Sequence, residues 1–317
     1  MKLQTQIPLK KGGNPIDYES CLLLLGSCFV ENMGRKLDYF KFQNLQNPFG
    51  ILFHPYAIEN LVERAIQKRS YTAKEVFFLN ERWHCYDAHS DLSDTSRESL
   101  LEKLNKGLEK TLQQIHKSTH ILITLGTSWV YRHFDSDRIV ANCHKVPQKK
   151  FSKELLSVKA IEKSLLSTIQ HIRSINENAQ FIFTISPVRH LKDGFNENQR
   201  SKAHLTAAVH KIFDVPSFGA RELFPSYELM MDELRDYRFY EPDMVHPNQL
   251  AIDYIWEKFK QTWISEEAYP IMSKVDNIQK GLRHRPFDPD SGQHRKFRES
   301  LEANISNLKK EYPFMEF

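Results

Sequence analysis

The sequence lacks the features that mark membrane, secreted and metal-stabilised proteins. No run approaches the roughly 18 apolar residues of a membrane-spanning helix, and the first 15 residues, MKLQTQIPLKKGGNP, lack the apolar core of a signal peptide. Only 4 cysteines occur in 317 residues, none as C-x-x-C, and the 14 histidines show no zinc-site spacing with them. We therefore expect free thiols, no metal, no cofactor and a cytoplasmic location.

Neither charge nor composition points to a nucleic-acid partner or to disorder. Basic residues number 44 and acidic residues 40, and this net charge of +4 is too small to predict nucleic-acid binding. Hydrophobic residues make up 40% and aromatic residues 12%, which is typical of a folded protein with a substantial core. The length fits one α/β catalytic domain with additions.

Three apolar runs bounded by turn residues predict buried strands: 21–26, 120–126 and 180–187. Amphipathic patterns predict helices at 96–118 and 152–178, the second with Ser152 as its N-cap. Strands that alternate with helices form parallel sheets covered on both faces. We therefore predict a three-layer α/β/α sandwich with a mainly parallel, flavodoxin-like sheet, whose active site lies on the loops after the strands.

Other segments are expected to extend this sandwich. Residues 76–90 and 129–143 are typical of hairpins with polar turns, which we expect to form flaps or edge strands near the site. After about residue 265 the chain becomes charged, with Pro and Gly, before a last helix at 300–312. We therefore divide the chain into a domain at 1–265 and a helical appendage at 266–317. Whether the appendage is a lid, a dimer arm or simple packing stays open.

The stretch LLLLGSCFVENMG places two nucleophile-capable side chains, Ser27 and Cys28, between a predicted strand and a helix. Gly26 allows a tight exit from the strand, and a helix N-terminus favours a developing anion and lowers the pKa of a thiol. Either side chain is a candidate nucleophile. The alternative is that the serine caps the helix and the cysteine fills the core.

A second motif, EPDMVHPNQLAIDYIWEKF, lies near the other end of the chain. Asp243 precedes His246 by three residues, and Pro247 suits the first turn of the helix that follows. A carboxylate at this spacing can hold one imidazole nitrogen and leave the other free as a general base. The alternative is a helix start that is capped by the aspartate or the histidine.

The first motif resembles that of the SGNH/GDSL hydrolase superfamily and, within it, the GSCFA family, whose name appears here as GSCFV. The superfamily pattern G-D-S-x-x-x-x-x-G fits without gaps when its two glycines are Gly26 and Gly34. Cys28 then stands at the serine nucleophile, and Ser27 stands where the aspartate usually is. The resemblance implies Cys28 as the nucleophile, with Ser27 as the alternative.

Other blocks of the superfamily are also found. Its closing block, D-x-x-H-P, implies His246 as the base and Asp243 as the orienting carboxylate. NPFGILFHP resembles the second block and implies that Gly50 donates a backbone N–H to the oxyanion. LGTSW falls where G-x-N-D is expected; Gly126 agrees, whereas Ser128 replaces the asparagine that usually donates a second bond.

Four further segments resemble the GSCFA family, and one of them, residues 224–247, contains Asp243 and His246. ISPVRH places Arg189 and His190 at a strand exit, where arginine can bind a carboxylate or phosphate; a surface ion pair is the alternative. ANCHKVP places Asn142, His144 and Lys145 at a hairpin end, either as substrate contacts on a flap or as a solvated strand end. The last segment, NENQRSK, suggests no particular role.

The resemblance covers about residues 15–260 and implies a hydrolase. We predict an acyl-ester hydrolase, an esterase or deacetylase that acts on an O-acylated carbohydrate or cell-envelope precursor. An acyltransferase with the same residues and a non-catalytic sugar- or small-molecule-binding protein are the alternatives. The expected partner is a small-molecule or saccharide acyl ester, with no nucleic acid and no membrane span. The sequence does not indicate the oligomeric state.

Overall fold

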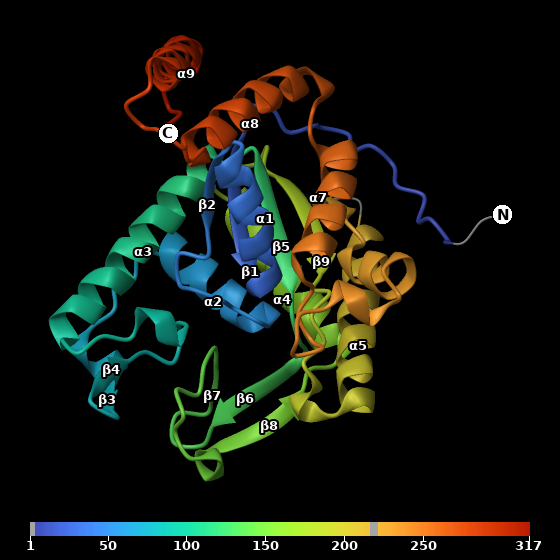
Figure 1. Cartoon of the computed structure of the whole chain (residues 1–317). Helices are drawn as coiled ribbons and strands as arrows, with labels where there is room; N and C mark the ends of the chain where they lie inside the picture. The colour runs from blue at the N-terminus through green and yellow to red at the C-terminus, as the bar shows by residue number, and fades with distance from the viewer. Residues whose placement is uncertain (1–3, 216–220) are drawn as a thin grey trace.

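A five-stranded sheet forms the centre of the computed structural model, which describes residues 4–215 and 221–317 (Figure 1). Its strands are β1 (Cys21–Gly26), β2 (Gln43–Gln46), β5 (His120–Leu125), β9 (Gln180–Ile185) and β10 (Arg221–Leu223). They lie in the order β10-β9-β5-β1-β2, and neighbouring strands are parallel. Counted along the chain this is the flavodoxin-like order 2-1-3-4-5. The three predicted strands and the parallel sheet are confirmed.

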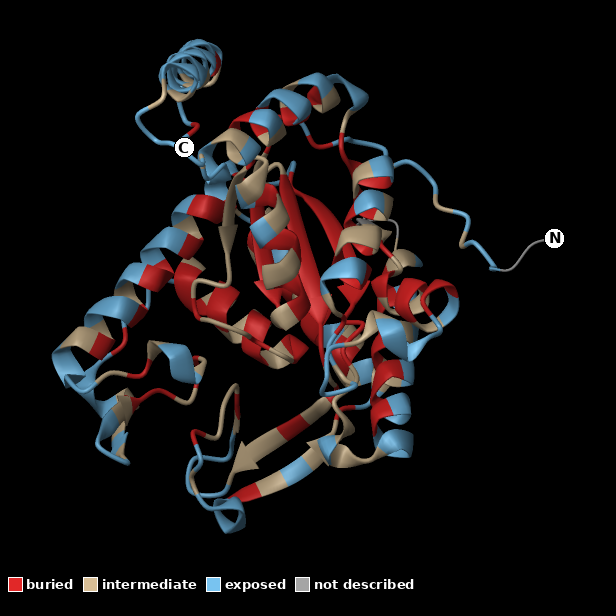
Figure 2. Cartoon of the chain, in the orientation of Figure 1, coloured by how far each residue is buried: buried red, intermediate tan, exposed pale blue. Residues whose placement is uncertain are grey.

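Helices cover both faces of the sheet, which confirms the predicted three-layer sandwich (Figures 1 and 2). One face carries α2 (Pro55–Ile66), α3 (Arg97–Lys117), α4 (Val158–Arg173) and α5 (Phe195–Phe213). The other carries α1 (Cys28–Tyr39), α7 (Gln249–Trp263) and α8 (Tyr269–Arg283). Successive strand side chains alternate between the faces, so Leu23 packs toward α2 and Leu24 toward α1.

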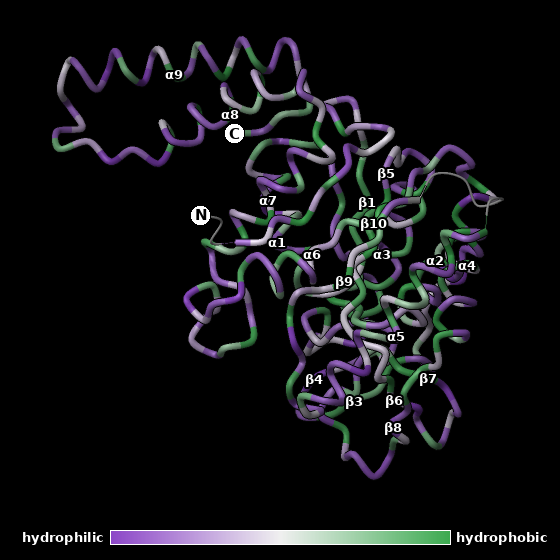
Figure 3. The backbone as a smooth tube through the Cα atoms, turned by 90° about the vertical axis from the view of Figure 1, so that its right-hand side faces the viewer, coloured by the Kyte–Doolittle hydropathy of each residue, from purple (hydrophilic) through white to green (hydrophobic). Residues whose placement is uncertain are grey.

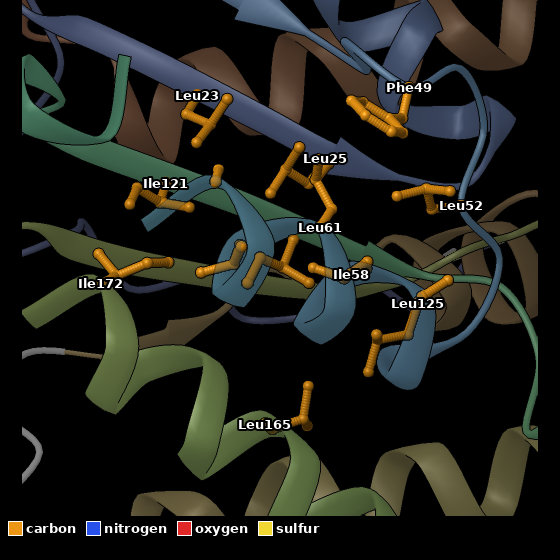
Figure 4. Close-up of a cluster of buried hydrophobic side chains, with 14 of the residues drawn as sticks. Leu23, Leu25, Phe49, Leu52, Ile58, Leu61, Ile121, Leu125, Leu165 and Ile172 are labelled. Atoms are coloured by element: carbon orange, nitrogen blue, oxygen red, sulfur yellow. The ribbon is translucent and has the colours of Figure 1, made fainter. Parts of the chain in front are cut away.

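The core on the α2 side is aliphatic and closely packed. Leu25 of β1 and Leu125 of β5 lie among Ile58 and Leu61 of α2 and Leu165 of α4 (Figure 4). Each of these side chains is at most 1% exposed. Burying one such side chain contributes about 2 kcal/mol, so this packing fixes the helices against the sheet. The carboxyl ends of the strands, and the loops that follow them, are thereby held at one edge.

Both predicted hairpins form: β3 (Phe77–Leu79) pairs with β4 (Arg82–His84), and β6 (Trp129–His133) pairs with β7 (Arg138–Val140). The first turn consists of Asn80 and Glu81, whose φ angles of 48° and 59° suit a tight antiparallel connection. Neither hairpin joins the central sheet. They form separate small sheets below it in the view of Figure 1.

The prediction that a helix starts at Ser152 is wrong. Phe151–Leu155 form strand β8, which pairs antiparallel with β6 in a three-stranded sheet. Helix α4 begins at Val158, where the Ser157 side chain accepts a hydrogen bond from the Ala160 N–H. Pairing with β6 satisfies the backbone groups of the strand, and this tertiary contact overrides the helical spacing of the apolar residues.

The C-terminal part contains two helices where the sequence predicted one. Helix α8 occupies residues of the appendage to which the sequence analysis assigned no helix; Pro270 stands in its first turn, where proline is compatible with a helix. Helix α9 (Gly292–Glu311) begins earlier than predicted and extends beyond the sheet along α8 (Figure 3). Val275 of α8 and Leu308 of α9 belong to the same buried cluster as α1 and α7. The appendage therefore shares the core of the sandwich.

Two sequence expectations concern membranes and targeting. Within residues 4–215 and 221–317, no helix combines the length and the apolar character needed to cross a membrane. Residues 1–3 of the segment that was inspected for a signal peptide lie outside the described residues.

Gly26 ends β1 in a backbone conformation that side chains rarely adopt. Its φ is +133°, and a Cβ atom added to it would lie 2.1 Å from the Thr124 carbonyl oxygen of β5. Its N–H donates to Asn47 Oδ1 (2.9 Å), just after β2, and the Ser27 N–H donates to Thr124 O (3.0 Å). One turn is therefore bonded to the ends of two neighbouring strands, and α1 begins immediately after it.

Replacing Gly26 with alanine should destabilise the protein strongly. The added Cβ meets backbone rather than a movable side chain, so we expect the free energy of unfolding to fall by about 3 kcal/mol or more. Urea unfolding followed by circular dichroism measures this change. Gly292→Ala is the control, because a Cβ there meets nothing within 4 Å. Equal unfolding midpoints for the two variants would contradict this account of the turn.

His54 ties helix α2 to the β6–β7 hairpin. Its Nδ1 accepts a hydrogen bond from the Ala57 N–H (3.2 Å) as the N-cap of α2, so Nε2 carries the ring hydrogen and donates to Val140 O (3.0 Å). The residue is 4% exposed. Burial lowers the pKa of His54 to about 4, and the bond to Val140 opposes this shift only in part.

This buried histidine predicts a loss of stability in mild acid. Between pH 6.5 and pH 4 the unfolded chain binds a proton at His54 that the folded chain excludes, so stability falls as the pH falls through this range. From pH 7 to pH 5 this contribution is about 2 kcal/mol. His54→Asn keeps a capping oxygen and should show a correspondingly smaller fall, measured by urea unfolding at both pH values.

The exposed His116 of α3 provides the control. His116→Asn should keep the wild-type dependence of stability on pH. If the stabilities of wild type and His54→Asn fell equally from pH 7 to pH 5, His54 would not be a source of the acid sensitivity.

Candidate active site

A cleft of ≈ 1010 Å³ runs along α1 between α7 and α8, and both sequence motifs contribute to it. Cys28, the first residue of α1, and His246, on the loop before α7, both line it. The other described residues that line it are Glu31, Asn32, Arg35, Lys36, Tyr39, Phe40, Glu241, Pro247, Gln249, Ile252, Asp253, Trp256, Glu257, Asp276 and Arg283. Those of α1 recur every three or four residues, so the cleft follows one face of a helix about 18 Å long.

Cys28 is half-buried at the N-terminus of α1, and burial dominates its electrostatics. Loss of solvation, followed by the nearby Glu31 carboxylate, raises the pKa of the Cys28 thiol to about 11. Lys202 and the backbone N–H groups of Cys28 and Phe29 act in the opposite direction and do not compensate. The sequence predicted a lowered pKa from the helix terminus alone. The thiol is instead protonated at neutral pH and needs a base to become a nucleophile.

Ser27 occupies a different environment from its neighbour. It is the N-cap of α1, is 0% exposed, and does not belong to the described lining of the cleft. Its hydroxyl is buried and has no hydrogen-bond partner among the described residues. Its Cβ lies 3.2 Å from the position that a Cβ on Gly126 would occupy, so the side chain lies against the β5 exit. Of the two candidate nucleophiles, Cys28 is the one that reaches the cleft.

Asp243 and His246 form a hydrogen-bonded pair on the loop before α7. Nδ1 of His246 lies 2.6 Å from Asp243 Oδ2, while Asp243 Oδ1 accepts the N–H groups of Val245 (2.8 Å) and His246 (2.9 Å). These bonds, led by the His246 N–H, lower the pKa of Asp243 to about 2. The side chains of His246 and Asp243 are 47% and 50% exposed. The pair is therefore ordered by its own loop and open to solvent.

The helix that follows this pair starts at Gln249, two residues after Pro247. The Asn248 side chain caps it by accepting the Ala251 N–H (3.1 Å), so Pro247 precedes the cap instead of standing in the first turn. The alternative interpretation gave the capping role to the aspartate or the histidine. Because Asn248 fills that role at α7, the side chains of Asp243 and His246 remain bonded to each other.

The three predicted oxyanion-hole residues are engaged elsewhere. The Gly50 N–H donates to Asn47 O (2.8 Å), and the Gly126 N–H donates to Phe53 O (2.8 Å). The Ser128 hydroxyl is 0% exposed and donates to Ser201 O (3.2 Å) of α5. Gly50 itself has a φ of +68°, and a Cβ there would lie 2.5 Å from His89 Cβ. These residues hold the loops at the sheet edge in place, around the start of α1.

Arg189 and His190 lie after β9, outside the described lining of the cleft. The Arg189 guanidinium stands 5.6 Å from the Phe195 ring centroid, and its Nε is buried without a partner among the described residues. Burial, followed by the charges of Lys202 and His246, lowers the pKa of His190 to about 4. His190 is therefore a neutral imidazole at neutral pH.

Asn142, His144 and Lys145 do not reach the cleft within the described residues. Asn142 Oδ1 accepts the His144 N–H (2.8 Å), and His144 Nε2 lies 2.7 Å from Cys85 O, beside the other hairpin. His144 is 5% exposed, and burial lowers its pKa to about 4. At Lys145 the chain turns with a φ of 62°. In this arrangement Asn142 and His144 connect the two hairpins.

Lys202 is a buried lysine that the sequence interpretation missed. It lies on α5 and is 0% exposed; its Nζ donates to the carbonyl oxygens of Gly126 and Ser186, both at 2.8 Å. The sequence pattern could have indicated its burial, because Lys202 stands on the same stripe of the helix as the buried Leu205 and Val209. A lysine in an apolar stripe points to a specific partner.

The contribution of α8 to the cleft was also missed. Asp276 accepts a hydrogen bond from the Tyr39 hydroxyl (2.7 Å), and the Arg283 guanidinium lies 5.0 Å from the Tyr39 ring centroid. Both α8 residues line the cleft together with Cys28. The sequence analysis left the role of the helical appendage open and placed a helix only at 300–312, so it gave no reason to expect α8 at the cleft. This helix is in fact one wall of the candidate site.

Comparisons with known proteins identify the family to which the chain belongs. A search of the curated proteins found no match to this chain. The GSCFA family model matches residues 21–259, from β1 into α7, and the model of the GSCFA domain protein, C-terminal domain, matches residues 275–317. The first match contains the turn of Gly26, Ser27 and Cys28, the Asp243–His246 pair and every strand of the central sheet. The chain is a member of the GSCFA family.

Proposed function

We propose that this protein hydrolyses acyl esters with Cys28 as the nucleophile and His246 as the general base. The observation that carries the proposal is the shared cleft, which Cys28 lines from α1 and His246 lines from the loop before α7. Asp243 holds the imidazole through Nδ1. A nucleophile, a base and an orienting carboxylate that converge on one cavity form the arrangement that covalent acyl transfer requires.

The first chemical step is formation of a thioester. Since the Cys28 thiol is protonated at neutral pH, His246 Nε2 takes the Sγ proton as the sulfur attacks the ester carbonyl. The bond of Nδ1 to Asp243 keeps a hydrogen on Nδ1 and leaves the lone pair on Nε2. The tetrahedral intermediate then collapses: the carbon–oxygen bond breaks, and the alcohol leaves with the proton from His246.

The second step returns the enzyme to its starting state. His246 takes a proton from water, and the resulting hydroxide attacks the thioester carbonyl. The carbon–sulfur bond breaks, the carboxylic acid departs, and His246 returns the proton to Cys28. In both steps the oxyanion lies at the N-terminus of α1, where the N–H groups of Cys28 and Phe29 already interact with the sulfur.

The lining of the cleft supports a polar, extended alcohol portion such as a saccharide. Carboxylates of Glu31, Glu241 and Glu257 offer acceptors for hydroxyl groups, and Tyr39 and Trp256 offer ring surfaces. The cleft reaches from Cys28 to α8, far beyond the space that an acetyl group needs. This supports an O-acylated carbohydrate or a related envelope precursor as the substrate class.

The nucleophile assignment predicts opposite results for two adjacent substitutions. Cys28→Ala should reduce turnover of p-nitrophenyl acetate roughly 10³-fold or more, and His246→Ala should act similarly. Ser27→Ala should retain turnover within about threefold, since Ser27 is buried outside the cleft lining. Release of p-nitrophenol measures turnover, and mass spectrometry of the acylated protein locates the thioester.

Cys143→Ala is the control for a general effect of losing a thiol, because Cys143 is half-buried outside the described cleft lining. Loss of turnover in Ser27→Ala with full turnover in Cys28→Ala would reverse the assignment. An acyltransferase would form an acylated product when a sugar or alcohol is added. Absence of both turnover and acylated wild-type protein would support a binding protein.

A further inference from the structure

Two arginines that line the cleft have no carboxylate partner. Arg35 lines it from α1 and Arg283 from α8, and both side chains are exposed. Within the described residues, the Arg35 guanidinium donates to the neutral side chain of Asn32. The Arg283 guanidinium lies 5.0 Å from the Tyr39 ring centroid. Neither forms an ion pair with another described residue, so two positive charges in the cleft are available to bind a negatively charged group.

Most of the carboxylates that line the cleft are already neutralised. Five described carboxylates line it, and the three that come from α7 and α8 each have a lysine partner. These pairs are Asp253–Lys36, Glu257–Lys260 (3.1 Å) and Asp276–Lys280 (2.6 Å). Of the other two, Glu31 lies in the first turn of α1 after Cys28, and the Glu241 N–H donates to His246 O (2.8 Å). The unpaired negative charges of the described lining therefore accompany the proposed nucleophile and base.

The two arginines lie farther along the cleft, in line with Cys28. Arg35 and Tyr39 follow Cys28 by 7 and 11 residues on α1, which is close to two and three whole turns, so the three side chains share one face. From the helical rise, Arg35 stands about 10 Å and Tyr39 about 16 Å from Cys28 along the axis. Arg283 lies at the Tyr39 end. A substrate that reacts at Cys28 and extends along α1 would meet both guanidiniums.

We propose that Arg35 and Arg283 form a phosphate subsite, and that the substrate is an acylated saccharide with a phosphate on the order of 10 Å from the acyl carbon. A guanidinium presents N–H donors in a planar fork that matches phosphate oxygens. A phosphate has enough charge and oxygens for two guanidiniums, whereas one guanidinium already matches a carboxylate. Sugar hydroxyls nearer Cys28 would meet the acceptors of Glu31 and Glu241. The position of the acyl end rests on the proposed function.

Calorimetric titration of the full-length protein tests the subsite with disaccharide derivatives that do not react. Trehalose 6-phosphate carries a phosphate, trehalose is its neutral counterpart, and lactobionate carries a carboxylate instead. We expect the wild type to bind trehalose 6-phosphate about tenfold more tightly than either of the others, because charge-assisted hydrogen bonds to two guanidiniums are strong. Equal affinities for trehalose 6-phosphate and trehalose would overturn the proposal. Equal or tighter binding of lactobionate would reject phosphate as the group that is bound.

Substitution of the arginines separates recognition of charge from the shape of the cleft. Arg35→Gln and Arg283→Gln should each weaken binding of trehalose 6-phosphate about fivefold and keep the wild-type affinity for trehalose. Arg69→Gln is the control and should match the wild type, because Arg69 is exposed beyond α2 and outside the described lining. Unchanged binding of trehalose 6-phosphate in both cleft variants would contradict the proposal, as would equal weakening for the two sugars. The wild-type comparison decides alone if a variant does not fold.

The proposed function fails separately, since these ligands are not carboxylic esters and their binding requires no turnover. Arginine-dependent binding of trehalose 6-phosphate by a protein that does not hydrolyse p-nitrophenyl acetate would support the phosphate subsite and reject the ester hydrolase. Hydrolysis of p-nitrophenyl acetate by a protein that binds trehalose 6-phosphate no better than trehalose would support the hydrolase and reject the subsite.

Discussion

The backbone of Gly26 and Ser27 is hydrogen-bonded to two neighbouring strand ends, through Asn47 Oδ1 and Thr124 O, and these bonds determine where α1 begins. A side chain at position 26 would collide with the Thr124 carbonyl. Because α1 starts immediately after this turn, Ser27 lies against the β5 exit and Cys28 faces the cleft. The identity of the candidate nucleophile thus follows from a backbone constraint in the sheet.

A second layer of polar contacts supports the turn from behind. Ser201 and Lys202 of α5 bond to the loop after β5, through Ser128 and Gly126. Gly126 and Ser128 resemble oxyanion-hole positions in sequence, yet here their hydrogen bonds connect α5 to the exit of β5. Buried hydrogen bonds of this kind are expensive to leave unmade, so they hold the loop in one arrangement. The chemistry that we propose uses the first turn of α1 and the Asp243–His246 pair.

Local sequence patterns predicted the secondary structure correctly where a strand is buried on both faces of the sheet or the chain turns tightly. The runs at β1, β5 and β9 were correctly predicted because continuous apolar strands leave few alternatives. β8 was mistaken for helix, because its conformation depends on pairing with β6. α8 was assigned no element of its own, because its position depends on burial against α1 and α7. The short β10 also gave no usable signal.

The sequence by itself determined the α/β/α class, the two motifs and their resemblance to the GSCFA family, because residue spacing and local turn chemistry carry that information. Only the tertiary structure decided which side chains meet. It placed Cys28 with His246 in one cleft, removed Ser27 from it and made α8 a wall. It also raised the pKa of the thiol, because loss of solvation outweighs the helix terminus. Burial and long-range contact depend on the whole chain, so no short stretch specifies them.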